Sequence, residues 1–273
     1  MGRPGSGKTH SIRTLIDAGL EVFCIITEPN AINTLTNMTG ASDAYKSAIA
    51  DKRLHWQFIQ PANPGWDSLK KSARLITTYS ISDLQKLPGM EKIHYAQFIE
   101  VLDCCSDFKD DLSGESFGPI EHFDPKTQVL VIDSLSGLNT MFLNLVVGAK
   151  PIRTLPEWGV AIDNELRFID HLCYGIPCHV VIMAHIDRQI DEVMGGIRKM
   201  VNALGKKAPQ EMPKSFTDVI LANEDAGKFS WSTSDSQTDT KATTGPATAS
   251  FSPSFVPLIE IWRERVLLTE PGD

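Results

Sequence analysis

The first nine residues carry the strongest chemical signal in the chain. Residues 2–9 (GRPGSGKT) have the spacing G-x-x-x-x-G-K-[ST]. Glycines let the backbone curl so that successive N–H groups point at one anion. With this spacing the lysine places a positive charge on the β- and γ-phosphates of a nucleotide, and the threonine hydroxyl holds Mg²⁺. We therefore predict a nucleotide-binding loop made of Gly2, Pro4, Gly5, Ser6, Gly7, Lys8, Thr9 and His10.

The flanks of this loop lead to two further expectations. Residues 10–18 predict a short helix closed by Gly19, and the positive end of its dipole would add to the anion site. A phosphate loop normally leaves a buried strand, but only Met1 precedes this one. We therefore expect an incomplete sheet and a poorly tethered loop. The alternative reading of these residues is a glycine-rich, flexible terminus.

Acidic residues stand at the ends of two apolar runs that predict buried parallel strands. Glu28 follows residues 21–27 (EVFCIIT), and Asp133 ends residues 128–133 (QVLVID). A carboxylate at a strand end beside a phosphate loop is suited to activate water, and we predict this role for Glu28. We predict that Asp133, together with Thr9, orders Mg²⁺. The alternative for Glu28 is a solvated carboxylate at a strand end.

A third apolar run, residues 177–184 (PCHVVIMA), predicts another buried strand that leads into His185. A polar side chain at this place would lie beside the γ-phosphate and report hydrolysis to the next segment; the alternative is a histidine that only caps or packs. Residues 186–205 contain two adjacent glycines and several basic residues, and we expect a flexible loop. The segment 186–207 is either a nucleic-acid or partner site or a solvated surface loop.

The remaining pattern places these motifs on one α/β domain. Strands are expected at residues 54–59 and 216–222, with residues 228–233 as the hairpin partner of the latter. Helical spacing occupies residues 66–78, 94–103 and 158–173, whereas residues 138–147 fit a helix or a loop and 107–119 a loop. We interpret residues 1–273 as a single domain with an inserted helical and loop region at about 36–126. A mobile Ser/Thr-rich arm is expected at about 234–253.

Composition narrows the class of protein. The 273 residues carry 26 Lys+Arg and 34 Asp+Glu, a net charge of −8, which argues against coating nucleic acid through bulk charge but leaves room for a local basic loop. The 42% hydrophobic content excludes wholesale disorder. No apolar run is long enough to cross a membrane, and we see no secretory leader. Five cysteines without C-x-x-C spacing fit a reduced compartment, so we expect a cytoplasmic protein.

In their order along the chain, these motifs resemble the RecA-like P-loop ATPases, and most closely the phage-encoded, recombinase-like ATP-binding proteins of that superfamily. The resemblance rests on GRPGSGKT (2–9), IITE (25–28), VLVIDS (129–134) and VVIMAH (180–185). It extends to DLSGESFG (111–118), EWGVA (157–161), ALGKK (203–207), FSWST (229–233) and TDTK (238–241). In AAA+ ATPases the base usually follows the second-motif Asp directly. Ser134 stands there in this chain, which favours the RecA-like assignment.

The resemblance implies a fold, residue roles and partners. The fold is a mostly parallel sheet flanked by helices. Glu28 corresponds to the catalytic base, and His185 to the residue that senses the γ-phosphate. Residues 186–204 correspond to a DNA-binding loop, and Lys241 to a lysine finger that reaches a neighbouring subunit's nucleotide. Relatives often carry Lys-x-Arg at the finger, whereas Thr243 replaces the Arg here.

The interpretation from sequence is therefore Mg²⁺-dependent ATP binding and hydrolysis in phage DNA recombination or replication. The implied partners are single-stranded DNA, through residues 186–207, and further copies of the chain in a filament or ring; the compartment is the host cytoplasm. Catalytic roles are expected for Lys8, Glu28, His185 and Lys241. Two alternatives stay open, a ring-type DNA motor of the helicase or packaging kind and a nucleotide-binding switch without turnover.

Overall fold

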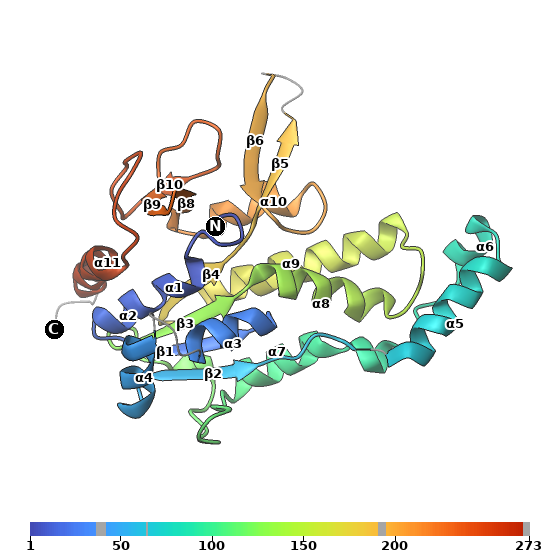
Figure 1. The fold of residues 1–273 in the computed structure, drawn as a ribbon, viewed down its shortest axis with the longest axis horizontal. Helices are drawn as coiled ribbons and strands as arrows, with labels where there is room; N and C mark the ends of the chain where they lie inside the picture. Colours follow the sequence, from blue (N-terminus) through green and yellow to red (C-terminus); the bar gives the residue numbers. More distant parts are fainter. Residues whose placement is uncertain (37–41, 64, 191–194, 270–273) are drawn as a thin grey trace.

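The computed structural model describes residues 1–36, 42–63, 65–190 and 195–269. Its centre is a parallel sheet in the order β2-β1-β3-β4, flanked by helices (Figure 1). The four strands are β1 (Glu21–Ile26), β2 (Leu54–Phe58), β3 (Gln128–Asp133) and β4 (His179–Met183). The protein is thus an α/β fold to which small antiparallel sheets are added.

The described residues form further helices and shorter strands outside the central sheet. The α-helices are α1 (Lys8–Ser11), α2 (Arg13–Asp17), α3 (Pro29–Thr36), α4 (Ser42–Ala50), α5 (Gly65–Thr78), α6 (Ile81–Lys86), α7 (Gln97–Ser106), α8 (Leu135–Val147), α9 (Leu155–Tyr174), α10 (Ala208–Glu211) and α11 (Val256–Thr269). Three 3₁₀ helices are η1 (Lys92–Tyr95), η2 (Ile120–His122) and η3 (Met212–Ser215). The shorter strands are β5 (Ile186–Ile190), β6 (Ile197–Val201), β7 (Asp218–Val219), β8 (Leu221–Asp225), β9 (Lys228–Ser232) and β10 (Lys241–Ala242).

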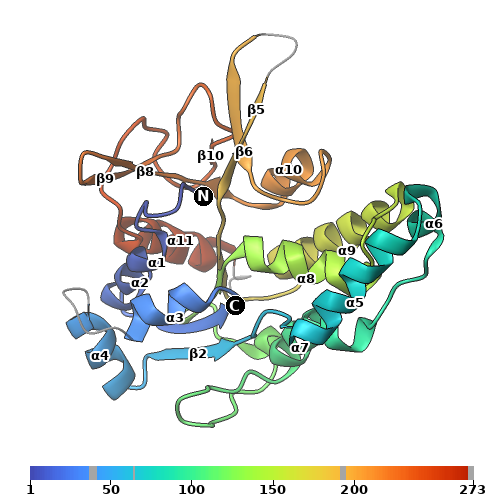
Figure 2. The same cartoon turned by 45° about the vertical axis from the view of Figure 1, so that its right-hand side comes forward.

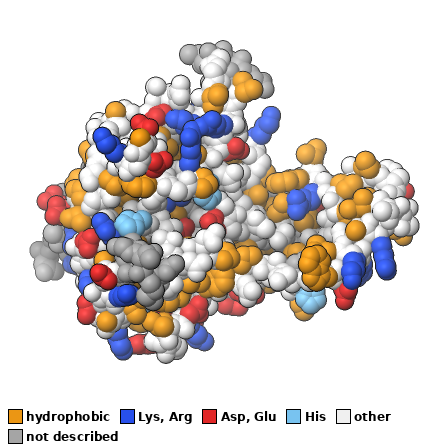
Figure 3. Space-filling model, viewed as in Figure 1, with side chains coloured by type: hydrophobic (Ala, Val, Ile, Leu, Met, Phe, Trp, Pro, Cys, Tyr) orange, Lys and Arg blue, Asp and Glu red, His pale blue; other side chains and the backbone are white. Residues whose placement is uncertain are grey.

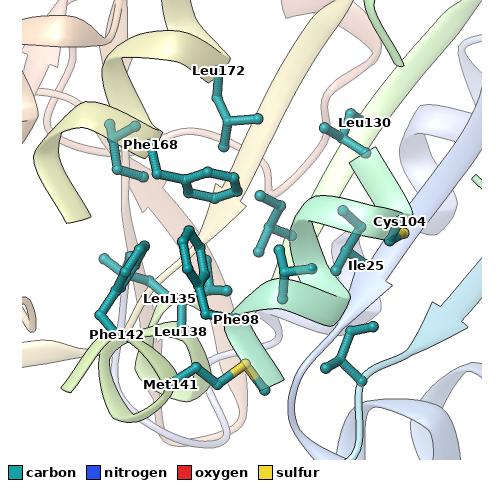
Figure 4. Packing of buried hydrophobic residues seen from close by; sticks show 14 of the residues in the cluster. Ile25, Phe98, Cys104, Leu130, Leu135, Leu138, Met141, Phe142, Phe168 and Leu172 are labelled. Carbon is teal, nitrogen blue, oxygen red and sulfur yellow. The ribbon is translucent and has the colours of Figure 1, made fainter. Parts of the chain in front are cut away.

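Side chains of the central strands alternate between the two faces of the sheet, so the core has two halves, one on each face. In β1, Phe23 and Ile25 belong to one buried cluster, and Val22, Cys24 and Ile26 belong to the other. Successive side chains of a strand point to opposite faces, so both faces of this sheet are apolar and must be covered. One face packs against α7, α8 and α9, as Figure 4 shows for the first cluster. The opposite face packs against α2, α4 and α11.

The structure confirms the four strands expected for the central sheet. The segment 138–147, left open between helix and loop, forms most of α8. Helix α9 begins with a capping box, in which Thr154 and Glu157 satisfy each other's main-chain N–H groups, and it carries a proline in its first turn. The expected strand 216–222 instead divides into β7 and β8, which pair with β10 and β9.

The basic segment 186–205 differs from the expected flexible loop. It forms an antiparallel hairpin in which β5 pairs with β6, from Ile186 opposite Val201 to Ile190 opposite Ile197. Three consecutive polar residues separate Ile186 from Ile190, and Arg198 stands next to Lys199, so neither strand shows the apolar–polar alternation by which a strand is recognised in sequence. The part of the prediction that falls on residues 191–194 lies outside the described residues.

The N-terminal loop is tethered, contrary to expectation. The Met1 amino group donates to the Ile220 carbonyl at 2.7 Å, and the Met1 carbonyl accepts from the Ala222 N–H at 2.7 Å. The Gly2 N–H donates to the Ala184 carbonyl at 2.9 Å, just beyond β4. Two residues therefore join the start of the loop to β4 on one side and to the β7–β8 segment on the other.

Two segments project from the body of the molecule (Figure 2). The hairpin β5–β6 extends from the end of β4 at the top of Figure 1, and α5 with α6 forms an arm at the right of the same view. Residues 234–253 lie along β9 and β6, where Thr233 and Thr248 exchange hydrogen bonds, Phe251 pairs with Trp231, and the Lys199 N–H donates to the Gln237 carbonyl. Among the helices described, none has the length and apolarity needed to cross a membrane.

Candidate functional site

The carboxyl ends of β1, β3 and β4 meet at one edge of the sheet, and the N-terminal loop lies at that edge. The Thr9 hydroxyl donates to Asp133 Oδ2 at 2.5 Å. Lys8 Nζ lies 3.4 Å from His185 Nδ1, and His185 Nε2 lies 3.5 Å from Glu28 Oε1. The structure thus brings together five predicted residues that come from four separate segments of the chain.

The conformation of the loop depends on two of its glycines. Gly5 has φ +77° and Gly7 has φ +79°, a left-handed backbone that other residues adopt only with strain. Between them the chain turns sharply, and Arg3, Pro4 and Gly5 stay exposed while Ser6 is buried. The side chain of Phe229, from β9, lies against Gly7 on one side of the loop. The loop therefore presents exposed main chain next to a buried lysine.

Lys8 is a buried cation held by main-chain carbonyls. Its ammonium donates to the carbonyl oxygens of Gly2, at 3.0 Å, and Arg3, at 2.9 Å. Burial lowers the pKa of Lys8, and the nearby charges of Asp133 and Glu28 oppose that shift. An anion bound in front of the loop would offset the cost of burying this ammonium.

Asp133 is a buried acid at the tip of the central strand β3. Only 3% of its surface is exposed. Burial raises the pKa of Asp133; the hydrogen bond from Thr9 lowers it, and the charge of Glu28 raises it further. The raised pKa of this acid and the lowered pKa of Lys8 have the same main cause. Burial removes water from each charged group, and the neighbouring groups do not fully compensate for that loss. A divalent cation at this position would stabilise the carboxylate.

Glu28 is held in place by the segment that follows β3. Ser134 Oγ donates to Glu28 Oε1. The Ser134 main chain is in turn fixed by Thr27, whose hydroxyl accepts from the Ser134 N–H at 3.0 Å and donates to the Ser134 carbonyl at 2.7 Å. A Cβ on Gly137 would lie 2.2 Å from Thr27 Oγ1, so this contact needs a glycine. The ends of β1 and β3 are thereby locked to each other beside the loop.

The residues present fit a triphosphate and a magnesium ion. The Ser6 hydroxyl is buried and has no hydrogen-bond partner among the described residues, although it lies in the predicted phosphate loop. Mg²⁺ prefers oxygen ligands and commonly uses one or two protein oxygens together with substrate phosphates. Thr9 Oγ1 and Asp133 Oδ2 are such a pair of oxygens. This donor set is unsuited to metals that favour sulfur or nitrogen ligands.

Other predicted site residues lie at the margin or away from this cluster. His10 is half-buried in the first turn after the loop, and burial followed by the charge of Arg13 lowers its pKa. Lys241 lies on β10, where its ammonium donates to the carbonyls of Phe216, at 2.5 Å, and Lys214, at 3.2 Å. Its role as a finger toward a neighbouring subunit stays a prediction.

The basic hairpin is attached directly to this site. Strand β5 begins at the residue after His185, and the His185 carbonyl accepts from the Asn202 N–H at 2.8 Å at the far end of β6. Lys and Arg side chains gather around the base of the hairpin (Figure 3). Some are engaged: Arg198 pairs with Asp239 at 2.5 Å and Lys199 with Asp235 at 3.7 Å.

Three contributors to the site were missed in the sequence. Ser134, which stands in the sequence where an AAA+ ATPase would have an acid, donates its hydroxyl to Glu28. Tyr45 donates its hydroxyl to the carbonyls of Thr9 and His10 at 2.9 Å. Phe229 lies against Gly7. Tyr45 and Phe229 lie far from the loop along the chain, and no spacing rule links them to it. The serine directly after a strand-end Asp was the one available signal.

No known protein family matches this chain, and no curated protein sequence is significantly similar to it.

Proposed function

We propose that this protein binds ATP with Mg²⁺ and hydrolyses it. The observation that supports this most is the meeting of a loop lysine, a threonine hydroxyl, two strand-end acids and a histidine at one edge of the sheet. Catalysis of phosphoryl transfer depends mainly on positioning and electrostatic stabilisation, which such a cluster supplies.

The loop and its lysine would hold the phosphates. The Lys8 ammonium exchanges its bonds to the carbonyls of Gly2 and Arg3 for phosphate oxygens, and the Ser6 hydroxyl gains the partner it lacks. Thr9 and Asp133 hold Mg²⁺, which when bound neutralises charge on the β- and γ-phosphates. In the present arrangement these two side chains bond to each other, so both oxygens already face one point.

Glu28 is placed to act as the general base. It takes a proton from water while the water oxygen attacks the γ-phosphorus and the bond to the ADP oxygen breaks. Ser134 donates to Oε1 of its carboxylate, and His185 Nε2 lies 3.5 Å from the same oxygen. His185 also lies next to Lys8, so a change in the phosphates there would reach the residue directly before β5.

We further propose that the β5–β6 hairpin binds single-stranded DNA and that the protein is a RecA-like, recombinase-type ATPase of phage origin. Arg188 is an exposed basic residue of this hairpin, and basic side chains that track a phosphate backbone give salt-dependent binding. His185 and Asn202 tie both ends of the hairpin to the nucleotide site. Assembly into a filament or ring with Lys241 in contact with the next subunit, and action in the host cytoplasm, belong to the same proposal.

The hydrolysis test measures phosphate release from ATP in Mg²⁺ by the full chain, with and without single-stranded DNA. Glu28→Gln keeps the size of the side chain but cannot take a proton, so turnover should fall by about 10²–10⁴-fold. Glu115→Gln, on an exposed carboxylate far from the loop, is the matched control. Equal turnover by Glu28→Gln and the original chain would refute the assignment of the base.

The DNA proposal has its own test. Arg188→Ala should weaken binding to single-stranded DNA several-fold and reduce its salt dependence, because one phosphate contact is lost. ATP hydrolysis without DNA should not change. Lys46→Ala, whose side chain is exposed on α4, serves as the control. Binding that is absent at low salt in the original chain, with and without ATP, would remove DNA from the proposal.

A further inference from the structure

Helix α5 lies in the arm that projects from the body of the molecule, and none of its described side chains is buried (Figure 2). One side of the helix is held from within the arm. Glu91 accepts from the Ser68 hydroxyl at 2.6 Å and from the Lys71 ammonium at 2.7 Å. The half-buried Leu75 lies on the same side, because it follows at helical spacing. These contacts fix the direction in which the opposite side of α5 faces.

The solvent side of α5 carries an apolar stripe. Its members follow one another at every third or fourth residue and so share one face of the helix: Trp66, Leu69, Ala73 and Ile76. Trp66 is 78% exposed, Leu69 53% and Ile76 57%, and Ala73 is exposed too. Apolar side chains are visible along this arm in Figure 3. Single apolar residues on a surface are ordinary, whereas a continuous stripe of large ones marks a contact surface.

The order of residues in this stripe matches its own reverse. When two identical helices pack antiparallel, residues lie level in pairs whose numbers have the same sum. Trp66 with Ile76 of the second helix, and Leu69 with Ala73, are pairs of one such set. In each pair a larger side chain meets a smaller one, which lets the two surfaces interdigitate. The stripe is therefore complementary to a second copy of itself.

Charges beside the stripe fit the same arrangement. Asp67 and Arg74 lie on one flank of it, and a two-fold axis puts that flank of both helices on the same side of the pair. Arg74 then comes level with Asp67 of the second copy to within one residue. In the single chain Arg74 has no ion pair among the described residues, and the exposed carboxylate of Asp67 lies 3.6 Å from Lys70 Nζ. A parallel pair would instead bring equal charges level with each other.

We propose that α5 is an interface between two copies of this chain, in which the two stripes pack antiparallel about a two-fold axis. Two helices of this length make a contact at the low end of specific interfaces, which bury about 1,200–2,000 Å². The dimer is therefore reversible and dissociates in the micromolar range. It does not involve the nucleotide site, so it is independent of ATP binding and of the contact proposed for Lys241.

Sedimentation equilibrium of the full chain, without nucleotide or DNA, measures the pairing. At about 50 µM the original chain should be mainly dimeric, and dilution should release monomer. Ile76→Asp places a charge in the stripe opposite Trp66 and should weaken association by about 30-fold or more. Thr78→Asp, at an exposed position of the same helix outside the stripe, is the matched control and should associate as the original chain does. Both variants should melt within about 2 °C of the original chain at submicromolar concentration, because both positions are exposed in the monomer.

Disulfide cross-linking tests the antiparallel direction. A tagged Leu69→Cys chain is mixed with an untagged Ala73→Cys chain and oxidised. Cross-links between the two kinds should exceed those within either kind by about fivefold or more, because a disulfide needs Cα atoms within about 7 Å and these two positions lie level only in the antiparallel pair. The original chain, with its five free cysteines, gives the background.

Three results would overturn the proposal. A chain that stays monomeric at about 100 µM has no such interface, and vesicles of anionic lipid that bind this monomer but not Ile76→Asp would assign the stripe to a membrane surface. Association that Ile76→Asp leaves unchanged would place the contact elsewhere on the chain. Cross-links within one kind of chain that are as frequent as those between the two kinds would contradict the antiparallel geometry. None of these results bears on the proposal of ATP hydrolysis.

Discussion

The carboxyl end of the central sheet, here called its tip, and the outer edge of the same sheet at β4 differ in the kind of side chain they bury. At the tip, Lys8 and Asp133 are buried, and the half-buried side chains of Thr9, Glu28 and His185 lie around them. At the outer edge of β4, the side chains are apolar and the packing is incomplete. Buried charge without full compensation supports the proposal of a charged ligand at the tip. The apolar edge of β4 is only less completely packed than the strands beside it.

We expect the largest effect from a substitution at the tip of the sheet. Asp133→Asn removes the charge that we assign to Mg²⁺ binding and keeps the shape of the side chain. ATP turnover should fall by about 10³-fold, because metal-assisted charge stabilisation of the phosphates is lost. Steady-state phosphate release over a range of Mg²⁺ concentrations measures this.

Chelation is the companion experiment for that prediction. EDTA should abolish turnover by the original chain, and added Mg²⁺ should restore it. If Asp133→Asn turned over ATP at the original rate and with the original Mg²⁺ dependence, the polar tip would need a different explanation.

Substitutions at two paired positions compare the fully packed centre of the sheet with its less packed outer edge. Ile132 of β3 and Ile182 of β4 are register partners, yet the first is fully buried and the second is half-buried at the outer edge of the sheet. Ile132→Ala should lower the free energy of unfolding by about 2–5 kcal/mol because it leaves a cavity. Ile182→Ala should cost only about 1 kcal/mol, since less apolar surface leaves water at that position. Urea unfolding of both variants checks the difference, and equal costs would mean that the edge is as well packed as the centre.

A buried acid away from the tip sharpens the comparison through pH. Glu165 of α9 is fully buried, accepts from the Leu204 N–H, and has one oxygen without a partner among the described residues. Burial raises the pKa of Glu165 from 4.5 to about 7. Because the pKa is higher in the folded state, stability is greatest below about pH 4.5 and is lost as the pH rises to about 7.

The measurement is urea unfolding at several pH values. For this one group the loss should amount to about 1–3 kcal/mol between pH 5 and pH 8. Glu165→Gln cannot titrate and should flatten that part of the profile. An unchanged profile in Glu165→Gln would mean that the carboxyl ionises as easily in the folded state as in the unfolded state.

The smallest effect concerns the residue that holds the base. Ser134→Ala removes the hydroxyl that donates to Glu28 while the Thr27 contacts to the main chain remain. We expect kcat to fall by about tenfold with little change in KM, because one hydrogen bond to a charged group is lost and nucleotide binding is untouched. Ser134→Thr, which keeps a hydroxyl, should retain more activity than the alanine variant. Rates equal to the original in Ser134→Ala would show that Glu28 is oriented without it.

The grouping of residues at the tip could be predicted from sequence because the elements that carry them are local. The loop spacing, the two strands that end in Glu28 and Asp133, and the strand that leads to His185 each fall within a short window. The hairpin β5–β6 was not predicted, since its strands lack apolar–polar alternation: Arg188 and Lys199 stand where that pattern would have an apolar residue. The firm attachment of Met1 and Gly2 was also not predicted, because their partners Ile220 and Ala222 lie more than two hundred residues away along the chain.

Equilibrium binding of a non-hydrolysable ATP analogue, measured by calorimetry in the presence of Mg²⁺, tests the central claim most directly. The account predicts one binding site per chain, loss of affinity when Mg²⁺ is removed, and a loss of about 100-fold or more in Lys8→Ala because the buried ammonium no longer meets the phosphates. Lys46→Ala, whose side chain is exposed on α4, should bind as the original chain does. Absence of binding to the original chain, or equal binding by Lys8→Ala, would contradict the account.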